Sequence, residues 1–285
     1  MYLNGRKRAI PVSVWINVFF GGFANQFGWI FFGFGMIFFW LFACNADMSF
    51  LLFSGERVTV QGVITESRET NASENEESIY ENHYTFVDAN GKRIQDFSYV
   101  TGKWLREGAE VTVEYPEGRP YYSRIQGMRR RMFGPAALLV LIFPLVGLVF
   151  LLFGLAKALR VAKLLQQGIP TKGKLLTKEA TNTTINEQRV YKFTFAFQDR
   201  SGRRFEVVEK THKVALLQDD REESLLYLQD NPEKAVLLDS LPGSPKIDRQ
   251  GAVQSTPLGR AFLQLVFPVL VLAGHGAYIY FTFFR

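Results

Sequence analysis

Residues 9–46 read AIPVSVWINVFFGGFANQFGWIFFGFGMIFFWLFACNA and contain no charged side chain in 38 consecutive positions. Two further stretches share this property, since residues 132–156 are uncharged over 25 positions and residues 261–284 over 24. A helix that crosses a bilayer core needs about 20 mostly apolar residues, and each stretch reaches that length. The sequence therefore predicts a multi-pass integral protein of the cell membrane with three spans.

The first stretch is too long for one span and short for two, because at about 1.5 Å per residue its helix would cover roughly 57 Å. We interpret it as an interfacial helix from Val12 to Phe23, a break at Ala24, Asn25 and Gln26, and a span from Phe27 to Asn45. A tight hairpin is the alternative. Whether residues 9–46 cross once or twice is therefore left open.

The polar segments between the spans resemble each other at an offset of 111 residues, which places Gly62 on Gly173 and Tyr84 on Phe195. After one inserted residue, Tyr115 corresponds to Tyr227. A shared spacing of this length indicates a duplicated structural unit. The expected organisation is an interfacial helix plus first span in 1–53, a first β domain in 54–131, a second span with a basic extension in 132–167, a second β domain in 168–260 and a third span in 261–285.

Each polar segment has the pattern of a small β domain. Apolar residues alternate with polar ones in 84–86 and 191–197, which is the period of a half-buried strand. The turn sequences at 88–91 and 199–202 end in glycine, as hairpins favour. We expect an α+β membrane protein with three transmembrane helices and two duplicated small all-β domains, barrel-like or sandwich-like. The acidic stretch Glu66–Glu81 is interpreted as a solvated loop.

Charge is distributed unevenly between the two segments. Residues 56–127 hold 8 basic and 13 acidic side chains, whereas residues 157–260 hold 18 basic and 13 acidic ones, and the whole chain carries +6. Lys and Arg at the span ends favour a cytoplasmic N-terminus and second β domain, with the acidic first β domain outside. No basic recognition element is apparent, so we expect no nucleic-acid partner. The expected partners are the lipid bilayer and an unidentified membrane or envelope protein, with a homo-oligomer as a further possibility.

Residues suited to catalysis or metal binding are sparse. The three histidines are dispersed and a single cysteine excludes an internal disulfide, so we expect no catalytic residue, no metal site and no cofactor. Two polar residues in the third span, His275 and Gln264, are weak intramembrane candidates, because polar side chains within a membrane helix are often functional. The favoured interpretation of His275 is a helix contact, helped by the small residues beside it.

Short motifs resemble a known family. The segments Gly62-Val63-Ile64, Tyr84-Thr85-Phe86 with Gly91, and 111–116 are similar to the bacterial membrane domain of unknown function numbered 3592. The resemblance implies an inner-membrane location and duplicated β domains. It implies no activity and no catalytic residues.

These observations favour a non-enzymatic role for the chain. Membrane-tethered β domains without a reactive cluster of side chains are typical of an adaptor, an assembly factor or a sensor that binds another protein through those domains. Strand addition to an exposed sheet edge is one way to do so. The alternatives are a homo-oligomeric transporter or channel component that uses the third span, and thirdly a cryptic membrane-bound hydrolase.

Overall fold

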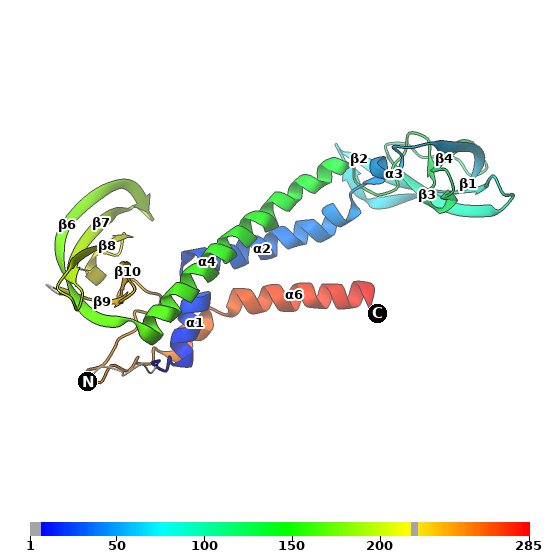
Figure 1. Ribbon diagram of the computed structural model, residues 1–285. Helices are drawn as coiled ribbons and strands as arrows, with labels where there is room; N and C mark the ends of the chain where they lie inside the picture. Colours follow the sequence, from blue (N-terminus) through cyan, green and yellow to red (C-terminus); the bar gives the residue numbers. More distant parts are fainter. Residues whose placement is uncertain (1–6, 218–221) are drawn as a thin grey trace. The chain divides into compact units, whose positions relative to one another are not determined.

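The computed structural model describes residues 7–217 and 222–285, and the chain is α+β (Figure 1). It divides into two compact units. One unit, which we call the β6–β10 unit, contains the chain up to Gly33 and residues 145–285. The other, the β1–β5 unit, contains residues 34–144. Each unit is described by itself below.

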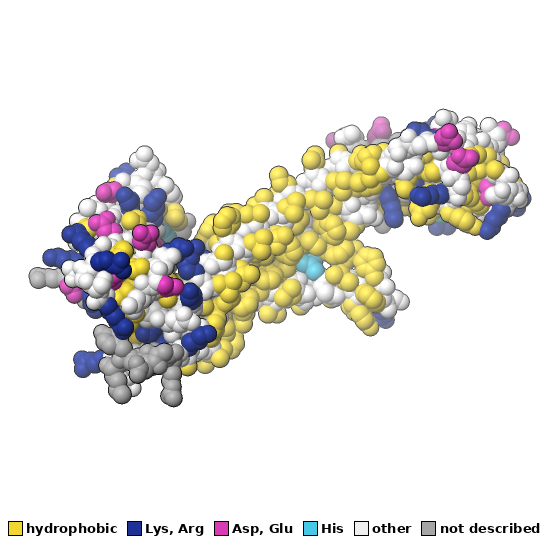
Figure 2. All heavy atoms as spheres, in the orientation of Figure 1, with side chains coloured by type: hydrophobic (Ala, Val, Ile, Leu, Met, Phe, Trp, Pro, Cys, Tyr) yellow, Lys and Arg dark blue, Asp and Glu magenta, His cyan; other side chains and the backbone are white. Residues whose placement is uncertain are grey.

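Three helical segments are long and apolar enough to cross a membrane, as the charge-free stretches predict: Phe23–Asn45, Pro135–Gln167 and Val266–Phe283. Figure 2 shows hydrophobic side chains gathered along the helices, whereas charged side chains gather over the sheets. The helices are α1 (Val12–Phe20), α2 (Phe23–Leu41), α3 (Ser49–Leu52), α4 (Ile142–Gln167), α5 (Leu258–Leu263) and α6 (Val266–Phe283). Short 3-10 turns are η1 (Ala43–Asn45), η2 (Pro120–Tyr122), η3 (Pro135–Leu141) and η4 (Val214–Leu217).

The break in the first apolar stretch lies earlier than predicted, between α1 and α2 at Gly21 and Gly22. Gly22 has φ +80°, a conformation that glycine adopts without steric cost. Asn25 and Gln26, which we expected to form the break, instead cap it: their side-chain amides donate to the carbonyls of Gly21 at 3.0 Å and Phe20 at 2.6 Å. Polar side chains in an apolar stretch therefore satisfy a helix end here.

Helix α1 packs one of its faces into a protein core. Val14 and Val18 are buried in one cluster with Val161 and Leu165 of α4 and with Leu226 of the sheet. The apolar residues of α1 recur at positions 14 and 18, one helical turn apart, and so lie on one face. Helix α1 thus belongs to the core that joins α4 to the second β domain.

Helices α2 and α4 approach closely through glycine within the β6–β10 unit. A side chain at Gly147 would overlap the backbone of Phe32, and one at Gly28 would lie 2.9 Å from the side chain of Leu151. Gly33 of α2 likewise lies against Val271 of α6. Small residues allow membrane helices to pack backbone against backbone.

The β1–β5 unit contains one antiparallel sheet in the order β3-β2-β1-β4-β5. Its strands are β1 (Arg57–Glu74), β2 (Glu77–Val87), β3 (Arg93–Thr101), β4 (Glu110–Pro116) and β5 (Arg124–Ile125). The two edges meet, because the backbone N–H of Ile125 donates to Ser98 Oγ at 2.9 Å and Tyr99 pairs with Arg129. The sheet is therefore nearly closed into a barrel around Ile64, Tyr84 and Val113.

The prediction of a solvated acidic loop at Glu66–Glu81 was wrong. Strands β1 and β2 continue through this stretch and pair with each other as a ribbon. Asn75 and Glu76 form the turn, with φ of 51° and 69°. Positive φ at both central residues gives the tight turn that matches strand twist. Strand pairing therefore outweighs the acidic composition of this stretch.

The β6–β10 unit contains a second antiparallel sheet in the order β10-β9-β6-β7-β8. Its strands are β6 (Ile169–Ile185), β7 (Gln188–Gln198), β8 (Arg204–Thr211), β9 (Glu222–Leu228) and β10 (Asn231–Leu237). The core beneath it contains Phe193, Phe195, Leu225 and Tyr227. Helix α4 ends at Gln167, and Gly168 separates it from β6, which begins at Ile169.

The two sheets share details of their internal geometry. Counted from β1 and from β6, the strand orders are the same. Register shifts fall between Ile64 and Glu66 in one sheet and between Leu175 and Thr177 in the other. The hydroxyl oxygen of Tyr115 accepts a backbone N–H of the β2–β3 turn at 3.2 Å, and that of Tyr227 accepts one of the β7–β8 turn at 3.0 Å.

The predicted hairpin turns are present in both sheets. Gly91 and Gly202 both have φ +80°. Asp88 Oδ1 accepts the backbone N–H of Asn90 at 2.9 Å, and Asp199 Oδ1 that of Ser201 at 2.8 Å. The hydroxyl of Ser201 and nearby backbone N–H groups stabilise the Asp199 carboxylate and lower its pKa to about 2.

Candidate functional site

The two intramembrane candidates from the sequence lie in different surroundings within the β6–β10 unit. The His275 ring lies against α2, with Nε2 3.1 Å from the carbonyl oxygen of Gly33. In the tautomer that carries hydrogen on Nε2, the ring donates to that oxygen. His275 therefore connects α6 to α2. The same residue of α2, Gly33, has no side chain and so leaves space for Val271 of α6.

Gln264 lies at the break between α5 and α6, so the third apolar stretch is not one continuous helix. Its backbone N–H donates to Ala261 at 3.0 Å, and its carbonyl accepts the side-chain amide of Gln26 at 3.0 Å. The contact is made by the Gln264 backbone, whereas the sequence pattern drew attention to the side chain. Gln26, which also caps the α1–α2 break, is the residue that sequence reasoning undervalued here.

Replacing His275 with leucine should lower the stability of the protein without abolishing folding. The variant loses a hydrogen bond between α6 and α2, and such a contact contributes about 0.6 kcal/mol on average and up to about 1.7 kcal/mol where helices pack within a membrane. Thermal unfolding in detergent measures the change. Leu270→Ile, at a position of α6 that is 63% exposed, is the matched control and should leave the midpoint unchanged. Normal stability combined with loss of ion flux would contradict the structural role and support transport.

The base of the first β domain holds a chain of polar contacts, which we call the base network: Asp47, Ser49, Arg57, Glu114 and Arg124. Arg124 Nε donates to Glu114 Oε1 at 2.7 Å, and its Nη1 donates to Ser49 Oγ at 3.0 Å. Ser49 Oγ in turn donates to Asp47 at 2.9 Å. Arg57 contacts the other Glu114 oxygen at 3.3 Å.

Burial makes the base network costlier to break than a surface ion pair, because a buried charge that loses its partner keeps its desolvation cost. The side chains of Glu114 and Arg124 are 5% and 17% exposed. The guanidinium of Arg124 lies 4.0 Å from the ring centroid of buried Phe53, which adds a cation–π contact. Because Ser49 opens α3 and Arg124 opens β5, the network fixes the end of the first span to the sheet.

A second tether lies beside the base network. Asp47 N–H donates to the Phe133 carbonyl at 2.8 Å, and Phe133 N–H donates to the Asn45 carbonyl at 3.0 Å. The chain thus enters and leaves the β1–β5 domain through two segments that pair with each other. This pairing ties Asn45 and Asp47 to Phe133 at the base of the domain.

A serine next to a carboxylate bears on the hydrolase alternative. Ser123 Oγ lies 2.9 Å from the hydroxyl of Tyr84 and donates to Asp96 Oδ2 at 2.8 Å. Burial raises the pKa of the Tyr84 phenol, and the Asp96 charge adds to the effect. Both Ser123 and Tyr84 are fully buried, so a substrate has no access to this hydroxyl. The hydrogen bonds with Tyr84 and Asp96 are those of a hydroxyl that belongs to the barrel interior.

In the first β domain, the ribbon formed by the end of β1 and the start of β2, which we call the first-domain ribbon, is hydrogen-bonded to other parts of the same domain. Arg129 Nη1 contacts both carboxylate oxygens of Glu74 at 2.9 and 2.8 Å, and Thr101 Oγ1 donates to the same carboxylate at 2.7 Å. Burial alone would raise the pKa of Glu74, but the hydrogen bonds from Thr101 and Arg129 outweigh it and hold the pKa below its usual range.

The corresponding ribbon of the second β domain has a different environment. Residues 176–189, which we call the projecting ribbon, are exposed on both faces except for Thr181. Strand β6 pairs with β9 only from Ile169 to Lys174. Among the described residues, no strand pairs with the outer edge of β6 beyond Lys174. Leu176 and Ile185 are 41% and 43% exposed on this ribbon.

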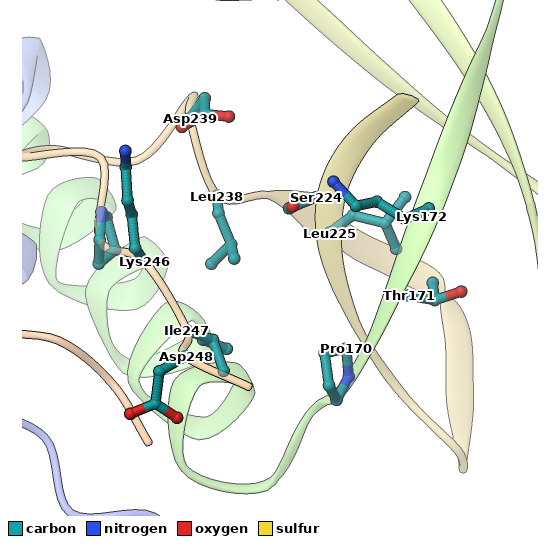
Figure 3. A pocket seen from close by; sticks show the side chains of 11 residues that line it. Pro170, Thr171, Lys172, Ser224, Leu225, Leu238, Asp239, Lys246, Ile247 and Asp248 are labelled. Carbon is teal, nitrogen blue, oxygen red and sulfur yellow. The ribbon is translucent and has the colours of Figure 1, made fainter. Parts of the chain in front are cut away.

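A pocket of about 460 Å³ lies in the same domain, between strands β6 and β9 and the loop that follows β10 (Figure 3). Its charged lining residues are Lys172, Asp239, Lys246 and Asp248, two of each sign. Lys172 Nζ donates to the Glu222 carbonyl at 3.3 Å. Asp248 Oδ1 accepts two backbone N–H groups of its own turn at 2.9 Å. With balanced charges, the pocket has no evident preference for an anion or a cation.

In residues 7–217 and 222–285, no group of three His, Cys, Asp or Glu side chains is placed to hold a metal ion. Cys44 is exposed near the end of the first span.

Comparisons with known proteins provide no family for this chain. No protein-family description and no curated protein matches it. One solved structure, of a replication protein A heterotrimer bound to single-stranded DNA, matches with 12% identity and a TM-score of 0.16, over 61% of this chain and 44% of that chain. At this TM-score the likeness carries no argument about fold or function. The similarity to the domain of unknown function 3592 stays a prediction.

One expectation is nevertheless corrected beside this match, the exclusion of a nucleic-acid partner. The exclusion rested on the lack of a basic recognition element in the sequence. That lack does not decide the question, because small five-stranded β domains bind single strands through a positively charged groove that strands and loops form only in the folded structure. The exclusion is therefore withdrawn.

Proposed function

We propose that this chain is a multi-pass protein of the cell membrane that acts as a non-enzymatic adaptor, assembly factor or sensor by binding another protein through its β domains. The projecting ribbon carries this proposal. An exposed ribbon edge presents unpaired backbone N–H and C=O groups, which natural proteins normally cover. Residues 181–185, Thr-Asn-Thr-Thr-Ile, combine high strand propensity with an absence of charge.

Strand addition is the binding mode that fits this surface. A partner strand that pairs with the outer edge of β6 would satisfy its backbone groups, and the exposed side chains of Leu176 and Ile185 would add apolar contact. The first-domain ribbon is held by Arg129 and Thr101, so it does not offer the same free tip. The two domains would then have separate roles, one fixed to its spans and one available to a partner.

We also propose that the two β domains are copies of one ancestral unit. The common strand order, the corresponding register shifts and the corresponding tyrosine contacts support this duplication. The Lys and Arg distribution supports a cytoplasmic N-terminus and second β domain, and a bacterial inner membrane fits the resemblance noted in the sequence. The transporter and hydrolase alternatives have less support, because His275 contacts a helix backbone and Ser123 is buried.

The partner site is tested by photocrosslinking in intact membranes. A benzoylphenylalanine placed at Thr183 of the projecting ribbon should give a reproducible, stoichiometric crosslink to one other protein. Adding Ile185→Lys should reduce its yield at least about tenfold, because a charged lysine on an edge strand opposes pairing. The crosslinked product is identified by mass spectrometry after denaturing purification.

Two controls make the result specific. Benzoylphenylalanine at Lys234, an exposed position of β10, should not give the same product. Val208→Lys places the same charge at an equally exposed apolar position of β8 and should leave the yield unchanged. Self-crosslinks alone, or equal loss with both lysine variants, would contradict binding through the ribbon.

A further inference from the structure

The one-turn helix α3 carries an apolar face that its own domain leaves open. Residues 48–55 contain no charged side chain. Ser49 and Phe53, one turn apart, are 5% and 2% exposed and attach the segment to the first β domain. The large apolar side chains between and beside them are 37–59% exposed: Met48, Phe50, Leu51 and Leu52. Apolar side chains gathered in this way mark a contact surface.

Hydrogen bonds fix α3 at the level where two apolar segments end. The first candidate span ends at Asn45, and the second starts at Pro135. Asp47 N–H donates to the Phe133 carbonyl at 2.8 Å. The Asp47 carboxylate in turn accepts the backbone N–H and the hydroxyl of Ser49, both at 2.9 Å. The first residue of α3 is therefore held beside both span ends, within the β1–β5 unit.

We infer that α3 docks on the bilayer surface, with Phe50 and Leu51 at the boundary between headgroups and acyl chains. The inference rests on the membrane insertion contained in the proposed function. The headgroup layer on each side of the hydrocarbon core is roughly 5–7 Å thick, so a helical turn bonded to the span ends lies within its reach. Apolar side chains at this boundary leave water, as those of interfacial helices do.

Continuity with the spans favours lipid as the occupant of this face. Leu41, near the end of α2, is 54% exposed, and Leu139, near the start of the second span, is 76% exposed. If these side chains face acyl chains, the exposed face of α3 continues the same apolar surface. Glu56 and Arg57, which follow the uncharged segment, have opposite charges. The docking therefore depends on apolar contact and not on the charge of the lipid.

The second β domain shows what happens to the corresponding face when protein covers it. At the offset of 111 residues, Phe53 corresponds to Leu164, which is likewise buried at 1% exposed. Phe50 corresponds to Val161, which is 4% exposed because it packs in one cluster with Val14 of α1. Within residues 34–144 no helix takes the place of α1, and Phe50 stays 53% exposed. The bilayer provides the missing cover.

Spin-label accessibility in the full-length protein, reconstituted in phosphatidylcholine vesicles, tests the docking. The exposed native cysteine is first removed by Cys44→Ser. A nitroxide at Leu51→Cys should have a ratio of collisions with oxygen to collisions with a water-soluble nickel chelate at least about threefold above that at Val87→Cys, because oxygen concentrates in hydrocarbon. Val87 is a 49% exposed apolar position at the opposite end of β2 from the first-domain ribbon. A label at Val149→Cys of α4 reports insertion itself.

A charge variant separates docking of α3 from tethering by the spans. Phe50→Asp/Leu51→Asp should open a nitroxide at Met48→Cys to the nickel chelate severalfold, because carboxylates leave the apolar boundary for water. Val63→Asp/Val87→Asp is the matched control, since it adds the same two charges at apolar positions of the same domain that are 40% and 49% exposed. The control should leave the Met48 label shielded from the chelate.

The outcomes separate this inference from the proposed function. Nickel access at Leu51 with a shielded Val149 label would overturn the docking and leave insertion intact, whereas access at both positions would refute insertion as well. A Leu51 label shielded from both reagents and broadened by a second nitroxide would place another copy of the chain on α3 and overturn the lipid contact. An unchanged Met48 label in Phe50→Asp/Leu51→Asp would also overturn it, because the spans alone would then set the depth.

Discussion

Replacing Arg124 with leucine is expected to lower the free energy of unfolding of the β1–β5 domain by about 3–5 kcal/mol. The variant leaves the Glu114 carboxylate, whose side chain is 5% exposed, with only the longer contact to Arg57 at 3.3 Å. It also removes the cation–π contact with Phe53 and the hydrogen bond to Ser49. A buried charge without its partner retains its desolvation cost, so removing one partner costs more than the pair contributes.

Hydrogen–deuterium exchange of peptides from β4 measures this opening free energy in the full-length protein. Glu66→Gln is the matched control, because it breaks an exposed pair, with side chains 60% and 48% exposed, in the same domain. Exposed pairs contribute about 0–1 kcal/mol, so exchange should change little. The double variant Arg124→Leu/Glu114→Leu should recover much of the stability. If Arg124→Leu and the control behaved alike, the base network would not stabilise the domain.

The spans and most strands could be predicted from the sequence because each depends on a local pattern. Uncharged stretches bounded by Arg8, Arg131 or Arg260 mark apolar helices without knowledge of any tertiary contact. The alternation of apolar and polar residues likewise predicts the strands, and the turn residues predict the hairpins. Gly91 and Gly202 occupy such turns with positive φ. These features depend on neighbours along the chain.

The base network could not be predicted, because its members come from widely separated parts of the chain. Asp47 and Ser49 follow a span, whereas Glu114 and Arg124 lie in β4 and after it. One signal was available: Glu114 interrupts an otherwise apolar alternation between Val113 and Tyr115, and a charge at such a position requires a partner. The identity of that partner depends on how the sheet closes.

The errors along the first apolar stretch have a related cause. Both the Gly21–Gly22 pair and the Asn25–Gln26 pair are signals of a helix break, and local composition does not rank them. The ranking comes from hydrogen bonding, since the two amides satisfy carbonyls at the end of α1. Similarly, nothing local distinguishes a solvated acidic loop at Glu66–Glu81 from a ribbon, because pairing between β1 and β2 decides it.

Replacing Gly147 with leucine is expected to prevent α2 and α4 from packing together. A Cβ at this position would lie 2.6 Å from Cα of Phe32 and 2.8 Å from its Cβ. A backbone atom cannot rotate away as a side chain can, so the helices must separate along their seam. Overpacking costs about 1–3 kcal/mol when neighbours can relax and more when they cannot. The yield of folded, monodisperse protein in detergent should fall severalfold, and its unfolding temperature should drop.

Gly274→Leu is the matched control for this prediction, because a side chain at Gly274 meets no atom within 4 Å. Both substitutions add the same apolar side chain to a helix that we expect to span the membrane, so they change hydrophobicity equally. Only Gly147→Leu forces side-chain atoms into a neighbouring backbone. Equal behaviour of the two variants would show that close approach of α2 and α4 is not needed for folding. A defect confined to Gly147→Leu would assign the glycine to helix packing, since helices within a bilayer have no hydrophobic drive to associate and depend on contact between well-fitted surfaces.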